Sequence, residues 1–108
     1  MTALEALADA EVGLGRYGPA VDAYDQAVRL AGDYGNTTTR TSALTGLART
    51  HATAGRPAHA ASCYEQALEL LPRPDPAGRA ESLVEELTTV LHALGRLDLA
   101  EAYRAHGH

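Results

Sequence analysis

Histidine and cysteine are the residues of this sequence that could most readily bind a metal or act as a nucleophile. The five histidines stand at positions 51, 59, 92, 106 and 108, and none has the i,i+4 pairing with a third ligand that a zinc site requires. Cys63 is the single cysteine, so neither an intrachain disulfide nor a cysteine metal cluster can form. His59 lies one helical turn before Cys63, but no acid follows that could orient it. We therefore expect no metal site, and we interpret His51 and Cys63 as packing residues.

The carboxylates and glycines do not form a catalytic pattern either. Glu81, Glu85 and Glu86 are close in sequence, but an exposed helix without a deep pocket gives them no reacting group to act on. The segment GLGRYG at positions 13–18 lacks the preceding strand that a phosphate-binding loop needs. The sequence therefore predicts no catalytic site and no cofactor, and we expect a protein that is not an enzyme.

The overall charge and hydropathy narrow the range of partners. The formal net charge is −5, and all nine of the Lys and Arg positions are arginine. A nucleic-acid or anionic-membrane surface needs clustered basic residues, so neither partner is expected. No apolar run reaches membrane-spanning length and the N-terminus shows no signal pattern, so we expect a cytoplasmic protein.

The segments that carry these residues return at a fixed interval. Shifting the sequence by 40 residues brings Gly15, Gly55 and Gly95 into register, each followed by arginine. Other positions that coincide are Leu4, Leu44 and Val84; Leu7, Leu47 and Leu87; Ala20, Ala60 and Ala100; Tyr24 and Tyr64; Ala27 and Ala67. A period of this length is typical of stacked repeats. We expect one domain with repeat units 1–36, 37–75 and 76–108.

Each unit divides into two helical halves. Spacings of three, four and seven between apolar residues predict helices at about 2–14, 17–31, 38–54, 57–71, 76–94 and 97–106. Glycine ends the first helix of each unit, because it adopts positive φ without steric cost. Between units, we expect Gly32 to end one helix and Thr37 or Thr38 to cap the next. Asp75 is expected to cap the helix that Pro76 opens.

This pattern resembles the tetratricopeptide repeat. That family places a large apolar residue and then Leu-Gly or Leu-Ala in the first helix of a hairpin, Gly at the turn, and Ala, an aromatic residue and Ala in the second. The second unit matches at Leu44, Leu47, Ala48, Gly55, Ala60, Tyr64, Ala67 and Pro72, and the third matches in part before it decays. The resemblance implies an all-α, right-handed α-solenoid of three stacked hairpins. It also implies a protein-interaction role, as in the repeat arrays of large bacterial regulators or in small adaptors.

The resemblance further implies a concave groove lined by the first helix of each hairpin. By helical spacing, the groove-facing residues are Glu5, Asp9, Val12, Thr45, Arg49, Ala52, Glu85, Thr89 and His92. Some family members grip a partner's C-terminal carboxylate with Lys and Asn in these helices, but here Glu5 and Asp9 would repel it. We expect a mildly acidic groove that binds a basic or polar peptide segment or a partner helix. The alternative is a solvated face on which Arg49 neutralises one of the two carboxylates.

The ends of the stack support a second hypothesis. No separate capping helix is visible at either end of the repeats, so an apolar edge is expected to be uncovered. Homodimerisation through such an end, with an idle groove, is the structural alternative to partner binding. The oligomeric state in solution distinguishes the two.

Overall fold

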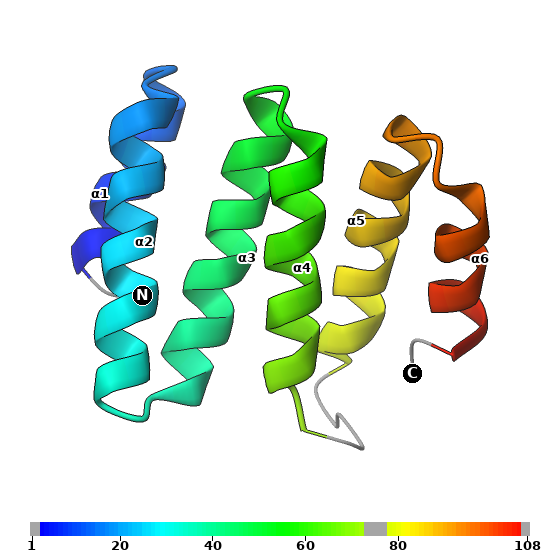
Figure 1. Cartoon of the computed structure of the whole chain (residues 1–108). Coiled ribbons are helices and arrows are strands. Elements are labelled where there is room, and N and C mark those ends of the chain that lie inside the picture. Colours follow the sequence, from blue (N-terminus) through cyan, green and yellow to red (C-terminus); the bar gives the residue numbers. More distant parts are fainter. Residues whose placement is uncertain (1–2, 73–77, 107–108) are drawn as a thin grey trace.

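The computed structural model describes residues 3–72 and 78–106, and within these residues the chain forms six α-helices and no strand (Figure 1). The helices are α1 (Ala3–Gly13), α2 (Tyr17–Asp33), α3 (Thr37–Thr53), α4 (Pro57–Leu70), α5 (Arg79–Ala93) and α6 (Leu97–His106). Pairs α1–α2, α3–α4 and α5–α6 form three antiparallel hairpins (Figure 1). The prediction of an all-α solenoid of helical hairpins is confirmed.

The hairpin turns share one hydrogen-bond pattern, which explains why glycine and arginine recur together. Gly15, Gly55 and Gly95 have φ of 76°, 79° and 74°, the left-handed region in which glycine pays no steric cost. The arginine after each glycine donates its backbone N–H to a carbonyl five residues earlier, at 2.8 Å in all three turns. This six-to-one bond is the Schellman motif, and it satisfies a carbonyl that the helix end would otherwise leave unpaired.

The turn between the first two hairpins follows the same pattern, which the sequence interpretation missed. Gly35, with φ of 68°, takes the left-handed position, and Asn36 donates its N–H to the Ala31 carbonyl at 2.8 Å. The expectation that Gly32 ends this helix is wrong, because α2 continues to Asp33. The expectation of a threonine N-cap for α3 is also wrong. The cap is Asn36, whose side chain accepts the backbone N–H of Thr39 at 3.0 Å.

The second inter-hairpin segment, between α4 and α5, is described only in part. Asp75 and Pro76, the predicted cap and opening residue of the fifth helix, lie outside the described residues. Helix α5 is described from Arg79, directly after Gly78 with φ of 69°.

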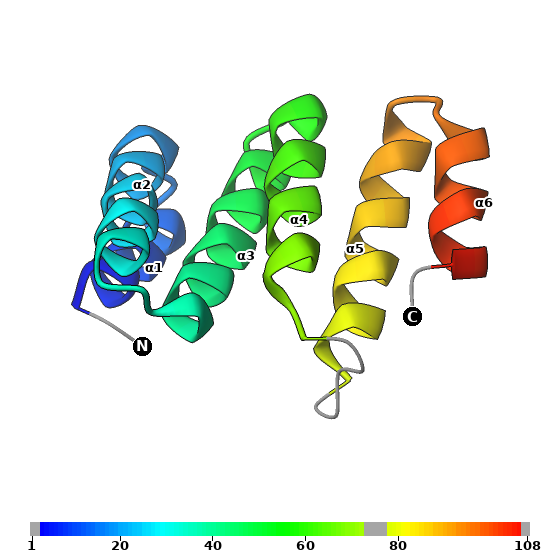
Figure 2. The same cartoon turned by 60° about the horizontal axis from the view of Figure 1, so that its bottom comes forward.

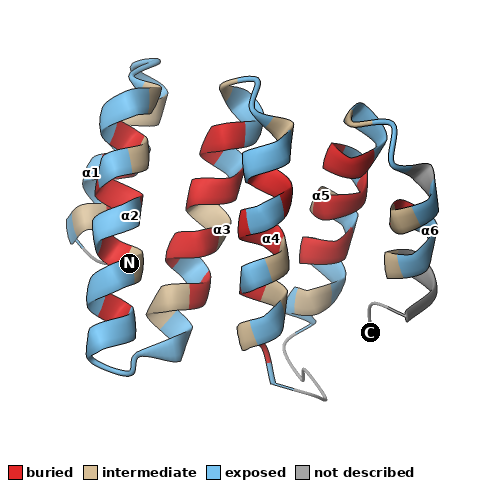
Figure 3. Cartoon of the chain, in the orientation of Figure 1, coloured by how far each residue is buried: buried red, intermediate tan, exposed pale blue. Residues whose placement is uncertain are grey.

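Each helix packs on its neighbour in the chain, and α1, which lies behind α2 in Figure 1, also contacts α3 (Figures 1 and 2). Alanine dominates the contacts, and the fully buried alanines are Ala8, Ala20, Ala43, Ala48, Ala60, Ala67 and Ala100. Side chains this small let helix axes approach at the short end of the usual range of about 8–10 Å. Buried positions therefore face neighbouring helices while the outer faces stay exposed (Figure 3).

Two tyrosines supply the bulk that alanine lacks. Tyr24 on α2 and Tyr64 on α4 are 4% and 2% exposed. A Cβ added at Gly46 of α3 would lie only 2.4–2.8 Å from ring and hydroxyl atoms of Tyr24. Gly46 is therefore a notch in α3 that receives the tyrosine ring of the preceding hairpin.

Candidate functional site

The first helices of the hairpins, α1, α3 and α5, are joined by side-chain contacts across one face of the stack. Glu5 on α1 bonds to Ser42 on α3, and Arg49 on α3 pairs with Glu86 on α5. Both contacts span 37 residues, because each joins a first helix to the next one in the repeat.

The sequence interpretation placed Glu5 as an acidic wall of an open groove, and this is wrong. The side chain is 2% exposed, and its Oε2 accepts a hydrogen bond from Ser42 Oγ at 2.8 Å. A buried carboxylate requires such donors, since an unsatisfied buried charge costs several kcal/mol. Glu5 thus holds α1 against α3 rather than presenting a charge to a partner.

Asp9, the second expected acidic group, remains exposed at its position on α1 but is engaged as well. Its Oδ1 accepts a hydrogen bond from the Tyr24 hydroxyl of the same hairpin. Burial of the ring, reinforced by this bond to Asp9, raises the pKa of Tyr24 above its ordinary value. The hydroxyl therefore stays protonated and continues to donate.

Arg49 was expected to neutralise a carboxylate of the first unit, and the structure places it elsewhere. Its Nε and Nη2 donate to Glu86 Oε1 and Oε2 at 2.7 and 2.9 Å, a bidentate pair. The Tyr64 hydroxyl donates to the same Oε1 at 3.0 Å. The hydrogen bonds from Arg49 hold the pKa of Glu86 below its usual value, and burial raises the pKa of Tyr64.

The 40-residue register explains why the two tyrosines differ. Glu86 occupies the position of Gly46 in the next unit, and Arg49 occupies the position of Asp9. Where the notch is open, the tyrosine enters it and bonds back to Asp9. Where a glutamate fills it, the tyrosine hydroxyl bonds forward to that glutamate, and Arg49 compensates the charge.

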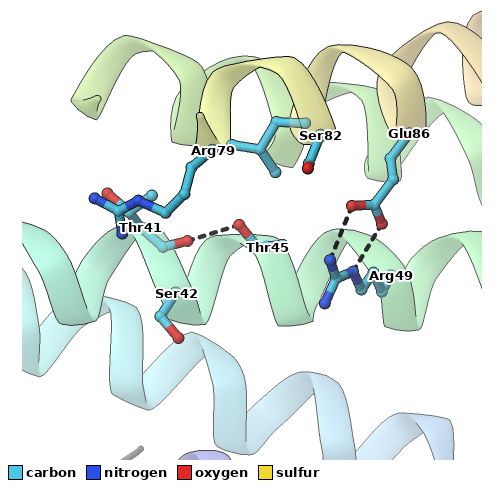
Figure 4. Close-up of a pocket in the computed structure, with 8 residues that line it drawn as sticks. Thr41, Ser42, Thr45, Arg49, Arg79, Ser82 and Glu86 are labelled. Atoms are coloured by element: carbon cyan, nitrogen blue, oxygen red, sulfur yellow. Dashed lines mark hydrogen bonds and ion pairs between the residues drawn. The ribbon is translucent and has the colours of Figure 1, made fainter. Parts of the chain in front are cut away.

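A cavity of about 330 Å³ lies between α3 and α5, beside the Arg49–Glu86 pair (Figure 4). Seven of its eight lining residues carry a hydroxyl or a charged group, and the lining consists of Thr41, Ser42, Thr45, Arg49, Arg79, Ser82, Leu83 and Glu86. Figure 4 shows Arg79 and Thr41 at one end and the ion pair at the other. The Thr41 and Thr45 hydroxyls each donate to the helix carbonyl four residues earlier, at 2.9 Å, so their lone pairs remain to accept.

Of the nine predicted groove residues, only Thr45 and Arg49 line this cavity. Val12 is half-buried, while Ala52, Glu85, Thr89 and His92 are exposed on α3 and α5 without lining it. The sequence interpretation missed Ser42, Arg79, Ser82 and Glu86. Glu86 could have been identified from the sequence, because it occupies the repeat position of Gly46 and stands 37 residues after Arg49.

Two of the histidines and the cysteine lie on α3 and α4, with His51 on α3 and His59 and Cys63 on α4. His51 is 7% exposed and stacks on His59 with ring centroids 5.1 Å apart, and Cys63 is 7% exposed. Burial, together with the charges of His59 and Arg56, lowers the pKa of His51. Within residues 3–72 and 78–106, no group of three His, Cys, Asp or Glu side chains is placed to hold a metal ion.

These features define a helical-repeat protein whose first helices form a shared polar surface. A model of the tetratricopeptide repeat family matches residues 1–73, more than half of the sequence. The chain therefore belongs to the tetratricopeptide repeat family, whose repeats generally mediate protein–protein interaction and are not catalytic. No curated protein and no solved structure matches the chain. None of its described helices combines the length and apolar character needed to cross a membrane.

Proposed function

We propose that the chain is a non-catalytic interaction module that binds a peptide segment or partner helix along the face formed by α1, α3 and α5. The cavity between α3 and α5 carries this proposal, because it is a hollow between two of the three helices of that face. It offers both hydroxyl acceptors and guanidinium donors, which suits a polar segment.

We infer the kind of side chain that enters from the chemistry of the lining. Glu5, Asp9 and Glu86 are committed to Ser42, Tyr24 and Arg49, so the acidic character expected from sequence is reduced. Arg79 is exposed at the mouth, and no ion pair joins it to another described residue. The inserted side chain is therefore proposed to carry a carboxylate or amide oxygen that accepts from Arg79.

The test is a peptide selection followed by affinity measurement. Peptides selected from a displayed library on the wild-type chain are titrated against Arg79→Glu, with Arg29→Glu as the matched control, since Arg29 is an exposed arginine on α2. Loss of a charge-assisted hydrogen bond weakens binding by at least about tenfold. Equal loss of affinity in both variants, or none in Arg79→Glu, would contradict the site.

A second variant tests the cavity without changing charge. Ser82→Leu adds apolar bulk at an exposed lining position, so it should reduce affinity while leaving the helical content unchanged. Selected peptides that bind this variant as tightly as the wild type would show that the cavity is not entered.

A further inference from the structure

The outward face of α1 carries an apolar stripe, which we define as Ala3, Leu7, Ala10 and Leu14. Their spacing of four, three and four residues is that of the a and d positions of a coiled coil. All four are exposed, with Leu7 53% and Leu14 68% accessible to solvent. Leu14 continues the line just beyond the helix, because its N–H donates to the Ala10 carbonyl at 3.2 Å.

The same register position is covered in the other two hairpins. Leu47 and Leu87, which align with Leu7, are 5% and 0% exposed. Helix α3 receives α2 of the preceding hairpin and α5 receives α4, whereas among the described helices α1 contacts only α2 and α3. The exposed leucines therefore lie on a stacking surface that no described helix covers.

The stripe itself carries no charge, and its neighbours on one side are neutral as well. Ala6 and Gly13, which flank it, are exposed and neutral. The acidic residues Glu5 and Asp9 point toward other helices of the stack, and Glu11 lies within 4.0 Å of Arg16. A helix that is apolar on its outer face as well as its inner one is typical of a helix buried on both sides.

We propose that a second copy of the chain covers this stripe, with the two α1 helices antiparallel about a two-fold axis. In that arrangement, an axis between Ala8 and Asp9 places Leu7 opposite Ala10 of the second copy and Leu14 opposite Ala3 of the second copy. Each large side chain then meets a small one, which is the alternation that lets facing helices interdigitate. A parallel pair would instead set leucine on leucine and leave gaps between the alanines.

The absence of charge on the stripe favours a second copy over a charged partner. Two identical faces that carry no ionised group meet without like-charge repulsion, and a two-fold contact is self-complementary by construction. The contact is confined to one helix of 11 residues. Such an interface is smaller than those of permanent dimers, so the dimer forms reversibly at micromolar or higher concentration.

Sedimentation velocity over a concentration series tests the proposal. The wild type should move from monomer to dimer without larger species, and Leu7→Glu should raise the dissociation constant by at least about tenfold. Leu30→Glu on α2 is the matched control, because Leu30 is 48% exposed and lies outside the stripe. A wild type that stays monomeric to millimolar concentration overturns the proposal, and so does growth into open chains through both ends.

A charge pair tests the antiparallel register. Leu7→Glu and Ala10→Lys should each be monomeric alone, because each buries an unpaired charge, and should form a one-to-one heterodimer when mixed. In that heterodimer the introduced glutamate and lysine face each other. Failure of the mixture to dimerise overturns the antiparallel pairing. Peptide binding by the α3–α5 cavity should be unaffected in both stripe variants, so this result is independent of the proposed function.

Discussion

Replacing Gly46 with alanine tests the packing that joins the first two hairpins. The added Cβ would lie 2.4 Å from Tyr24 Cε1 and 2.5 Å from Cζ, well inside van der Waals contact. The ring is 4% exposed and its hydroxyl is bonded to Asp9, so it cannot withdraw without losing both burial and that bond. Overpacking of this kind costs about 1–3 kcal/mol, and the lost hydrogen bond adds about 1 kcal/mol.

Helix propensity acts in the opposite direction and has to be subtracted from this loss of stability. Alanine in a helix interior is favoured over glycine by about 1 kcal/mol. The net expectation is that Gly46→Ala lowers the free energy of unfolding by about 1–3 kcal/mol, the range left when the propensity gain is set against the two costs. For a domain of this size the melting temperature should fall by about 4–8 °C per kcal/mol.

Urea unfolding followed by circular dichroism measures the change, with Gly18→Ala as the control. Gly18 lies in α2, and a Cβ built there meets nothing within 4 Å, so this variant should be neutral or slightly stabilised. In a Tyr24→Leu background the penalty of Gly46→Ala should vanish, because the ring that causes it is gone. A Gly46→Ala variant as stable as Gly18→Ala, or an unchanged penalty without the ring, would refute the notch.

Three further predictions concern single side chains. Asn36→Ala should lower stability by about 1 kcal/mol in thermal unfolding, because the Thr39 N–H loses its acceptor; no change would mean that the cap is not formed. His51 has a lowered pKa in the folded chain, so the unfolded state binds more protons and stability should fall as pH drops through about 6.5. In His51→Gln the urea midpoint should change less between pH 7.5 and 5.5 than in the wild type. An unchanged pH dependence would mean that another group causes it. Burial raises the pKa of Cys63 to about 11. At pH 8 its thiol should therefore react with an aromatic disulfide far more slowly in the folded protein than in the protein unfolded in urea. Equal rates would contradict the burial of Cys63.

The sequence was sufficient to predict the helices, the hairpins and most of the core. This is because the determinants are local or strictly periodic. A glycine that ends a helix, a Pro57 at a first helical turn and an alanine at each close contact act within a few residues of themselves. The one turn that was misread, at Gly35, had the same chemistry displaced by 20 residues from Gly15, and a search at half the period would have found it.

The site residues were harder to predict because they depend on which helix faces which across the stack. Helical spacing alone places Glu5 and Thr45 at equivalent positions, yet one is a buried carboxylate and the other lines a cavity. What separates them is the side chain itself, because Glu5 accepts a hydrogen bond from Ser42 of the next first helix, whereas Thr45 donates to the Thr41 carbonyl of its own helix. Contacts between units follow spacings of 37 and 22 residues rather than the 3–4 residues of a helix.

One repeat position governs much of the difference between the two interfaces. At Gly46 the absence of a side chain lets the preceding tyrosine enter the notch, and no ion pair is needed to join the helices there. At Glu86 the same position carries a carboxylate, which requires a donor from the neighbouring first helix and finds it in Arg49. The charged position also lines the cavity, whereas the glycine does not. A repeat can therefore keep its backbone while one residue decides whether the junction is a packed notch or a polar hollow, and the binding character of this face has to be argued junction by junction.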